Sequence, residues 1–208
     1  NSPLFFIHNQ QIEDSKKYTL ITIDKIHNNI ISATHSILSV ISMSIYLYSQ
    51  SINWLYITSV LSFSYFIWDT YYIIIHRSSD NYPYILHHVI ALVMIQDQLL
   101  NYNRNFIIFL FCIAEFSNFP IYVIYHLKKI GYTHNMVYLQ LCQLIWFGFF
   151  RIIVFGCYIK DCISLIDNII KLLSLLFIYI LGVYWSVCQS KSLYKQYTKS
   201  FRITHKTE

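Results

Sequence analysis

The chain has 208 residues, of which 56% are hydrophobic and 12% are charged, with a net charge of +5 and a mean hydropathy of +0.45. A typical soluble chain has roughly 25% charged residues, so this composition excludes an ordinary soluble domain, and its hydrophobicity excludes a disordered chain. Continuous apolar runs with only four glycines and three prolines favour membrane helices over a β-barrel.

Six apolar segments approach the roughly 20 residues that a helix needs to cross a hydrocarbon core. They are predicted at residues 30–48, 54–76, 84–101, 106–126, 137–158 and 166–189. The short polar breaks between them indicate antiparallel neighbours in one all-α, polytopic membrane bundle. We therefore expect an N-terminal segment on the cytoplasmic or matrix side (1–29), a six-helix membrane domain (30–189) and a basic C-terminal tail (190–208).

The basic residues indicate how the bundle is oriented. With six spans, both termini share one side of the membrane, and that side carries eleven of the fifteen Lys and Arg residues. The opposite side carries only Arg104 and Lys160, while Arg151 and Lys171 lie within spans. Positive residues are enriched on the cytoplasmic side of membrane proteins, so both termini should be cytoplasmic, or face the matrix in a mitochondrion.

Polar side chains recur at helical spacing within three of the apolar segments, which places them on one face of each predicted helix. Such groups are costly in lipid, so the faces should meet one another, either as hydrogen-bonding glue between helices or around a functional cavity. The stripes comprise His35, Ser39, Ser42, Tyr46 and Ser49 in the first segment; Thr58, Ser62, Tyr65, Asp69, Tyr72 and His76 in the second; and Cys112, Glu115, Asn118, Tyr122 and His126 in the fourth.

Two features within the spans allow more than one interpretation. Adjacent helical residues diverge by about 100°, so His87 and His88 are poorly placed to clamp one metal ion, although one ring can enter a cavity while the other braces against a helix. A neutral imidazole there could accept a proton from an attacking amine or hydroxyl. Arg151 lies deep in its span and needs a negative partner, which could be Glu115 or Asp97, or the anionic group of a ligand.

The five cysteines form no CxxC pair, which argues against a zinc site or a disulfide framework. We expect them to be buried packing residues. No metal site is predicted.

The order of several short motifs resembles the TLC-domain family, which contains the ceramide synthases and their non-synthase relatives. The motifs are His76-Arg77 followed by Pro83 and Ile85-Leu86-His87-His88-Val89-Ile90-Ala91-Leu92; Tyr65-Phe66-Ile67-Trp68-Asp69; Ala114-Glu115-Phe116-Ser117-Asn118-Phe119-Pro120; Thr34-His35-Ser36; and Phe149-Phe150-Arg151-Ile152. The resemblance covers about residues 30–190. The Ala114–Asn118 block lacks the His-Asp-x-x-Ser-Asp pattern of the synthases and is closer to the non-synthase branch.

The resemblance implies a helical bundle around a lipid-accessible cavity, in the endoplasmic reticulum or another endomembrane, with the mitochondrial inner membrane as the alternative. It leaves three functions open: a protein that binds long acyl or sphingoid lipids and influences membrane lipid composition, an acyl-CoA-dependent N-acyltransferase, or a non-catalytic subunit of a larger membrane complex.

In an acyltransferase, His87 and His88 would be the catalytic pair and Asp69 a supporting acid. The predicted cavity residues are His35, Tyr65, Tyr72, His76, Glu115, Asn118 and Arg151. An acyltransferase would use acyl-CoA as its co-substrate, and no resident cofactor is expected. The expected partners are membrane lipids, together with other membrane subunits if the protein belongs to a larger complex. No nucleic acid is expected to bind.

Overall fold

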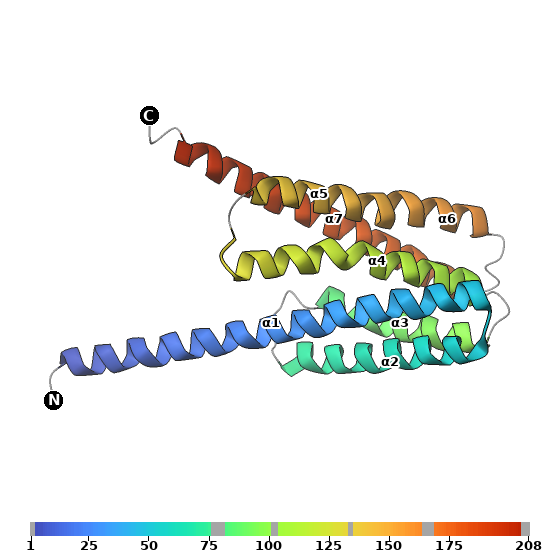
Figure 1. Cartoon of the computed structure of the whole chain (residues 1–208), viewed down its shortest axis with the longest axis horizontal. Helices are drawn as coiled ribbons and strands as arrows, with labels where there is room; N and C mark the ends of the chain where they lie inside the picture. The colour runs from blue at the N-terminus through green and yellow to red at the C-terminus, as the bar shows by residue number, and fades with distance from the viewer. Residues whose placement is uncertain (1–2, 76–81, 101–103, 133–134, 164–168, 205–208) are drawn as a thin grey trace.

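The computed structural model describes the backbone of residues 3–75, 82–100, 104–132, 135–163 and 169–204, and the side chains of residues 23–198 within those ranges except residue 162. All regular structure in these ranges is helical. The helices are α1 (Pro3–Ser49), α2 (Ile52–Ile75), α3 (Tyr82–Leu100), α4 (Arg104–Lys129), α5 (Met136–Gly148), the π-helical turn η2 (Phe149–Val154), α6 (Phe155–Cys162) and α7 (Ile169–Thr204). Because α5, η2 and α6 follow one another without a break, the described residues form six long rods (Figure 1).

The six rods confirm the all-α membrane bundle expected from the sequence. Within the described ranges, four helical stretches are long and apolar enough to cross a membrane: Ile23–Ser49, Arg104–Lys129, Met136–Asp161 and Ile169–Thr198. Helices α2 and α3 are not among these four stretches, because polar residues such as the serines and Asp69 of α2 and the adjacent histidines of α3 interrupt their apolar sequence. Helices α1 and α7 both continue past the predicted domain limits at residues 30 and 189.

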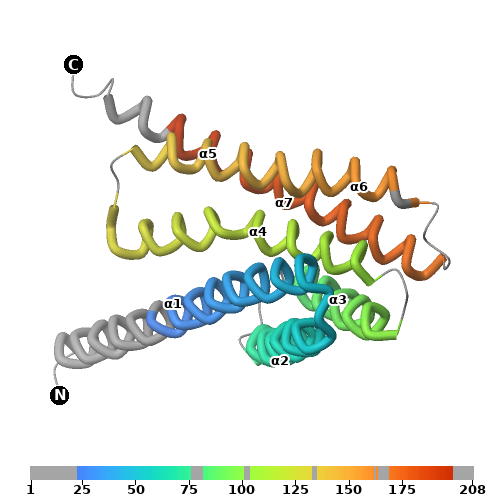
Figure 2. The backbone as a smooth tube through the Cα atoms, turned by 45° about the vertical axis from the view of Figure 1, so that its right-hand side comes forward, coloured from blue at the N-terminus to red at the C-terminus, as the bar shows by residue number. Residues whose placement is uncertain are grey.

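Helix α4 lies at the centre of the bundle. It packs against α1 and α3 on one side and against α5, η2 and α6 on the other, while α2 lies between α1 and α3 and α7 lies against α5 (Figures 1 and 2). Half of the apolar stretch of α4 is buried, a larger share than in the other three candidate spans. The buried core therefore follows α4, and side chains from both halves of the bundle meet there.

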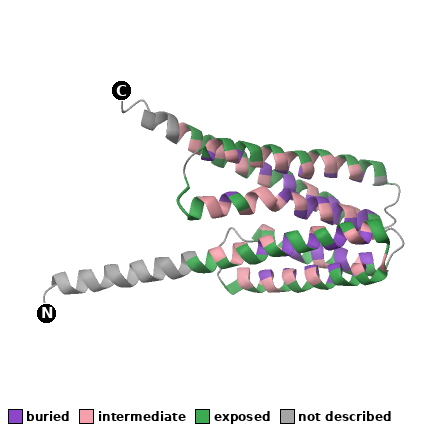
Figure 3. Cartoon of the chain, in the orientation of Figure 1, coloured by how far each residue is buried: buried purple, intermediate pink, exposed green. Residues whose placement is uncertain are grey.

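The bundle has polar residues inside and apolar residues outside, as expected for a protein in lipid. On α1, Ser36 and Ser39 are completely buried, whereas Ile37 and Leu38 between them are 48% and 45% exposed. Figure 3 shows the same pattern along the rods, with buried residues between helices and exposed residues on outward faces. An exposed Ile or Leu costs nothing in hydrocarbon, while a lipid-facing polar group would cost several kcal/mol. The predicted convergence of polar faces thus has a direct energetic cause.

The expectation of buried cysteines is wrong for those whose side chains the structure describes; Cys162 lies outside them. Cys142, Cys157 and Cys188 are exposed on outward faces and Cys112 is half-buried. A thiol is weakly polar and can face hydrocarbon at little cost, so the apolar runs that contain these cysteines did not require them to point inward.

A proline inside α4 creates a hydrogen-bonding need that α5 meets. Pro120 has no N–H group, so the carbonyl of Phe116, four residues earlier, loses its helical donor. The indole N–H of Trp146 on α5 donates to this carbonyl at 3.2 Å. The rings of Phe116 and Trp146 also pack with centroids 4.9 Å apart. The missing hydrogen bond at Pro120 is therefore a point where α4 and α5 are joined.

We predict that Trp146→Phe lowers the free energy of unfolding by about 1–2 kcal/mol, because it leaves the Phe116 carbonyl without a donor. In a Pro120→Ala background the new Ala N–H can bond this carbonyl, so the same substitution should cost less. Unfolding of the purified protein in detergent, followed for both single variants and the double variant, gives the coupling energy. Trp185→Phe is the matched control, since in the described structure the Trp185 Nε1 has no hydrogen-bond partner. If the changes in unfolding free energy caused by Trp146→Phe and Pro120→Ala were additive, Trp146 would not be the donor that replaces the missing N–H of Pro120.

Candidate functional site

Polar residues from the first three helices meet in one packed network. The ring of His35 on α1 stacks on Tyr65 of α2, with centroids 3.9 Å apart and planes 10° from parallel. The Tyr65 hydroxyl donates to Ser32 Oγ at 2.9 Å, and it lies 3.4 Å from Asp69 Oδ2. Nε2 of His88 on α3 lies 3.5 Å from the same Oδ2 atom. His35, Asp69 and His88 are each less than one-tenth exposed, so the network is shielded from lipid.

The contacts of His88 assign its proton. Thr70 donates its hydroxyl hydrogen to the Phe66 carbonyl at 2.6 Å, so its oxygen is left to accept a hydrogen bond from Nδ1 of His88, 3.1 Å away. With Nδ1 donating to Thr70, a proton must also lie between Nε2 and Asp69 Oδ2, on the imidazolium or on the carboxylic acid, because two lone pairs facing one another would repel. His88 is thereby fixed at both ring nitrogens and braces α3 against α2.

Glu115 on α4 joins this network to a second region. Ser36 Oγ donates to Glu115 Oε2, and the Ser36 oxygen is 3.3 Å from the hydroxyl of Tyr122. Glu115 is buried, at 6% exposure. This contact ties the polar stripe of α1 to that of α4, and it leaves the carboxylate at the edge of a cavity.

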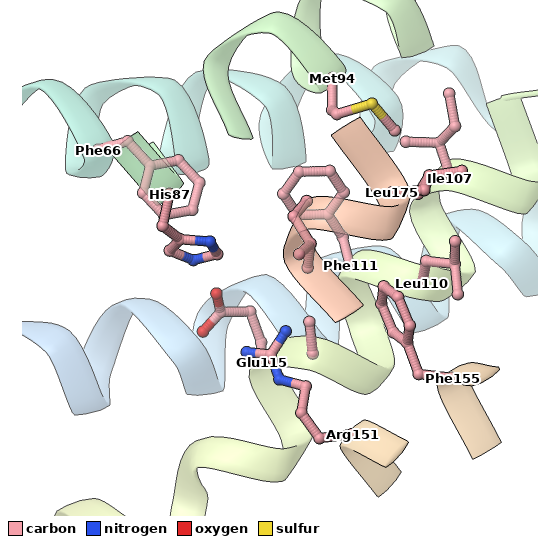
Figure 4. Close-up of a pocket in the computed structure, with 12 residues that line it drawn as sticks. Phe66, His87, Met94, Ile107, Leu110, Phe111, Glu115, Arg151, Phe155 and Leu175 are labelled. Carbon is pink, nitrogen blue, oxygen red and sulfur yellow. The ribbon is translucent and has the colours of Figure 1, made fainter. Parts of the chain in front are cut away.

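The cavity lies between α2, α3, α4, η2, α6 and α7, and it has two chemically different ends (Figure 4). The space not filled by atoms is about 370 Å³, including its opening. Its polar end is formed by His87, Glu115 and Arg151, and in Figure 4 the side chains of Glu115 and Arg151 come from one side and the His87 ring from the other. The other lining residues are Phe66, Met94, Ile107, Leu110, Phe111, Ala114, Phe155, Leu175 and Ile178.

His87 and His88 diverge into these two regions. His87 faces the cavity, where its ring contacts Trp185 of α7 edge-on at 5.5 Å, and its Nδ1 has no hydrogen-bond partner in the part of the chain that the structure describes. His88 points into the packed network. The described residues contain no cluster of three His, Cys, Asp or Glu side chains suited to a metal ion.

Local backbone geometry places Arg151 in the cavity. The residue lies in the π-helical turn η2, where the helix is wider than an α-helix, and its side chain is only 2% exposed. Gly182 of α7 makes room for it, since a Cβ atom on this glycine would come within 2.9 Å of Arg151 Cγ. The guanidinium lies 5.8 Å from the centre of the Phe147 ring.

Neither predicted protein partner neutralises Arg151 directly. Asp97 instead pairs with Lys171 of α7, with Nζ and Oδ1 3.2 Å apart. Glu115 lines the same cavity as Arg151, but no ion pair within 4 Å joins these two described residues. The Nε and Nη1 atoms of Arg151 have no hydrogen-bond partner among the described residues. Arg151, a lining residue of the cavity, thus has two buried donors that the described residues leave unfilled.

The structure separates the predicted catalytic and cavity residues into three groups. Glu115, Arg151 and His87 line the cavity, while His35, Tyr65, Asp69 and His88 form the packed network next to it. Tyr72 stacks on Trp68, and neither Tyr72 nor Asn118 is among the cavity's lining residues. His76 lies outside the described residues. Tyr72 and Asn118 thus lie on the same polar stripes but outside the lining of this cavity, because a stripe runs the length of a helix and the cavity occupies only part of that length; their roles stay predictions.

Sequence reasoning missed the apolar lining of the cavity and the role of Ser36. Apolar residues in a membrane helix carry no signal that distinguishes a cavity wall from a lipid-facing surface. Ser36 did carry a signal, since it follows His35 and lies on the inward face of α1.

The comparisons with known proteins agree with this architecture. The family model described as TLC domain matches residues 25–194, which is most of the chain. No curated protein and no solved structure matched the chain. The extent of the family match shows that the chain belongs to the TLC-domain family, and the four long apolar helices make it a multi-pass integral membrane protein.

We predict that Gly182→Ala destabilises the protein by about 1–3 kcal/mol, because the new methyl group overlaps the Arg151 side chain in a packed interior. The measurement is the midpoint of thermal unfolding in detergent. Gly148→Ala is the matched control, since a Cβ there meets nothing within 4 Å. Equal behaviour of the two variants would show that Gly182 is not needed to accommodate Arg151.

Proposed function

We propose that this TLC-domain protein binds a long-chain lipid in the cavity between its helices and thereby influences the lipid composition of its membrane. The observation that carries the proposal is the division of the cavity into a polar end, with His87, Glu115 and Arg151, and an apolar remainder. A lipid has the same division between head and chain. Ligand sites are typically concave, mostly apolar and supplied with a few well-placed polar groups.

The position of the cavity supports the same proposal. The outward faces of the helices around it carry exposed apolar residues such as Val93 and Leu176. The hydrocarbon of the bilayer is therefore the medium next to the bundle, and a lipid chain would pass from one apolar environment to another. The space, about 370 Å³ counted together with its opening, is small for a lipid, which favours one chain over two.

We further propose that the protein resides in an endomembrane such as the endoplasmic reticulum, with both termini on the cytoplasmic side. The orientation rests on eleven basic residues on the side of the termini against two on the other side.

We predict that enlarging a side chain in the cavity wall removes the bound lipid. Ala114 lines the cavity and is buried, so Ala114→Phe should fill part of the space. Val123→Phe is the matched control on the same helix, since Val123 is 57% exposed and is not among the lining residues. Mass spectrometry of lipids extracted from each purified protein should show one enriched single-chain class in the wild type and in Val123→Phe, and its loss in Ala114→Phe. Recovery of bulk phospholipid alone from the wild type would refute lipid binding.

The position of His87 favours a second candidate function, acyl transfer. Its ring lies at the polar end of the cavity with Nδ1 unoccupied, where it could accept a proton from an amine or hydroxyl that attacks an acyl-CoA thioester. The new C–N or C–O bond would form as the C–S bond breaks, and coenzyme A would leave as the thiol. In this reaction His88 and Asp69 act as positioning residues, because their contacts are with each other and with α2.

An N-acyltransferase would convert acyl-CoA and a long-chain amine to an amide, and we predict that His87→Ala would reduce turnover at least a hundredfold. His88→Gln should cause a smaller loss, since the amide can still bond Thr70. His126→Ala is the control, because His126 lies at the far end of α4 and does not line the cavity. Full turnover by His87→Ala would end this candidate. The absence of turnover in the wild type would leave lipid binding without catalysis.

A further inference from the structure

The charge balance of the cavity points to the chemistry of its ligand. Arg151 is a permanent cation, 2% exposed, in the interior of a membrane bundle. A charged side chain at such a depth costs several kcal/mol unless it is paired or solvated. Two of its three guanidinium nitrogens have no partner among the described residues. Buried donors are rarely left unfilled in folded proteins, so these two need an acceptor that the described chain does not supply.

Glu115 offsets this charge only in part. Its Oε2 atom accepts the hydrogen bond from Ser36, which holds the carboxylate toward α1. No ion pair within 4 Å connects it to Arg151 in the described structure. The remaining polar lining residue, His87, presents an unoccupied ring nitrogen rather than a negative charge. The guanidinium therefore provides hydrogen-bond donors without a matching anion.

We propose that the lipid bound here carries an anionic oxyacid head, a carboxylate or a phosphate ester, held by Arg151 with the single chain in the apolar part of the cavity. This inference rests on the proposed lipid binding. A guanidinium presents its donors in a planar fork that matches two oxygen atoms of one acid group. Glu115 at the same end disfavours a head of high negative charge, which makes a monoanionic carboxylate the better match.

Four probes with the same chain test this assignment on the purified full-length protein in detergent at alkaline pH. The probes are hexadecanoate, hexadecyl phosphate, hexadecanol and hexadecylamine. We expect hexadecanoate to bind about tenfold or more tightly than hexadecanol, because hydrogen bonds from a charged donor to an anion exceed those to a neutral hydroxyl. Tighter binding of hexadecyl phosphate than of hexadecanoate would instead identify the phosphate ester as the source of the anionic head.

Arg151→Gln should abolish the preference for the anionic probes, so that hexadecanoate and hexadecanol then bind within about twofold of one another. Arg151→Lys keeps the charge but loses the planar fork, so it should retain part of the preference for the anionic probes. If Arg151→Gln does not fold, Arg151→Lys is the variant to measure. Equal binding of all four probes by the wild type, or the tightest binding by hexadecylamine, would overturn the anionic assignment while leaving lipid binding intact. Failure of the wild type to bind any probe, together with no lipid enriched on purification, would overturn the proposed function itself.

Discussion

Each polar side chain on these helices must find its partners inside the bundle, because the hydrocarbon outside offers no hydrogen bonds. This constraint explains why α1 buries Ser36 and Ser39 while it exposes Ile37 and Leu38. It also explains the joint at Pro120, where Trp146 supplies the donor that the proline removes. The fold is thus held by the pairing of polar groups as well as by apolar packing.

The same constraint produces two neighbouring regions with different properties. In the network of His35, Tyr65, Asp69 and His88, stacking and hydrogen bonds fill the space between α1, α2 and α3. Beside it, Glu115 and Arg151 face a space that protein atoms leave open. The first region fixes the positions of three helices, and the second is where we propose that a lipid binds. The two adjacent histidines of α3 connect them, since one ring lies in each.

The sequence predicted the convergence of polar faces because helical periodicity alone determines which residues share a face. His35, Asp69 and Glu115 were found in this way. The π-helical turn at Arg151 was not predictable, because no residue pattern distinguishes it from an α-helix. The pairing of Asp97 with Lys171 also depends on how α3 and α7 lie side by side, which periodicity does not specify.

The contacts between α3 and α7 explain how a cavity can persist at the centre of a packed bundle. Near the C-terminal end of α3, Asp97 forms an ion pair with Lys171 of α7, and near the N-terminal end of α3, Tyr84 stacks on Trp185 in the middle of α7 with centroids 5.3 Å apart. Met94 of α3 and Leu175 and Ile178 of α7 line the cavity between these fixed points. Helices α3 and α7 run antiparallel and are in contact near both ends of α3, so they cannot close the space between these contacts without breaking one of them. The open space beside Arg151 is therefore maintained by contacts that lie away from the site itself.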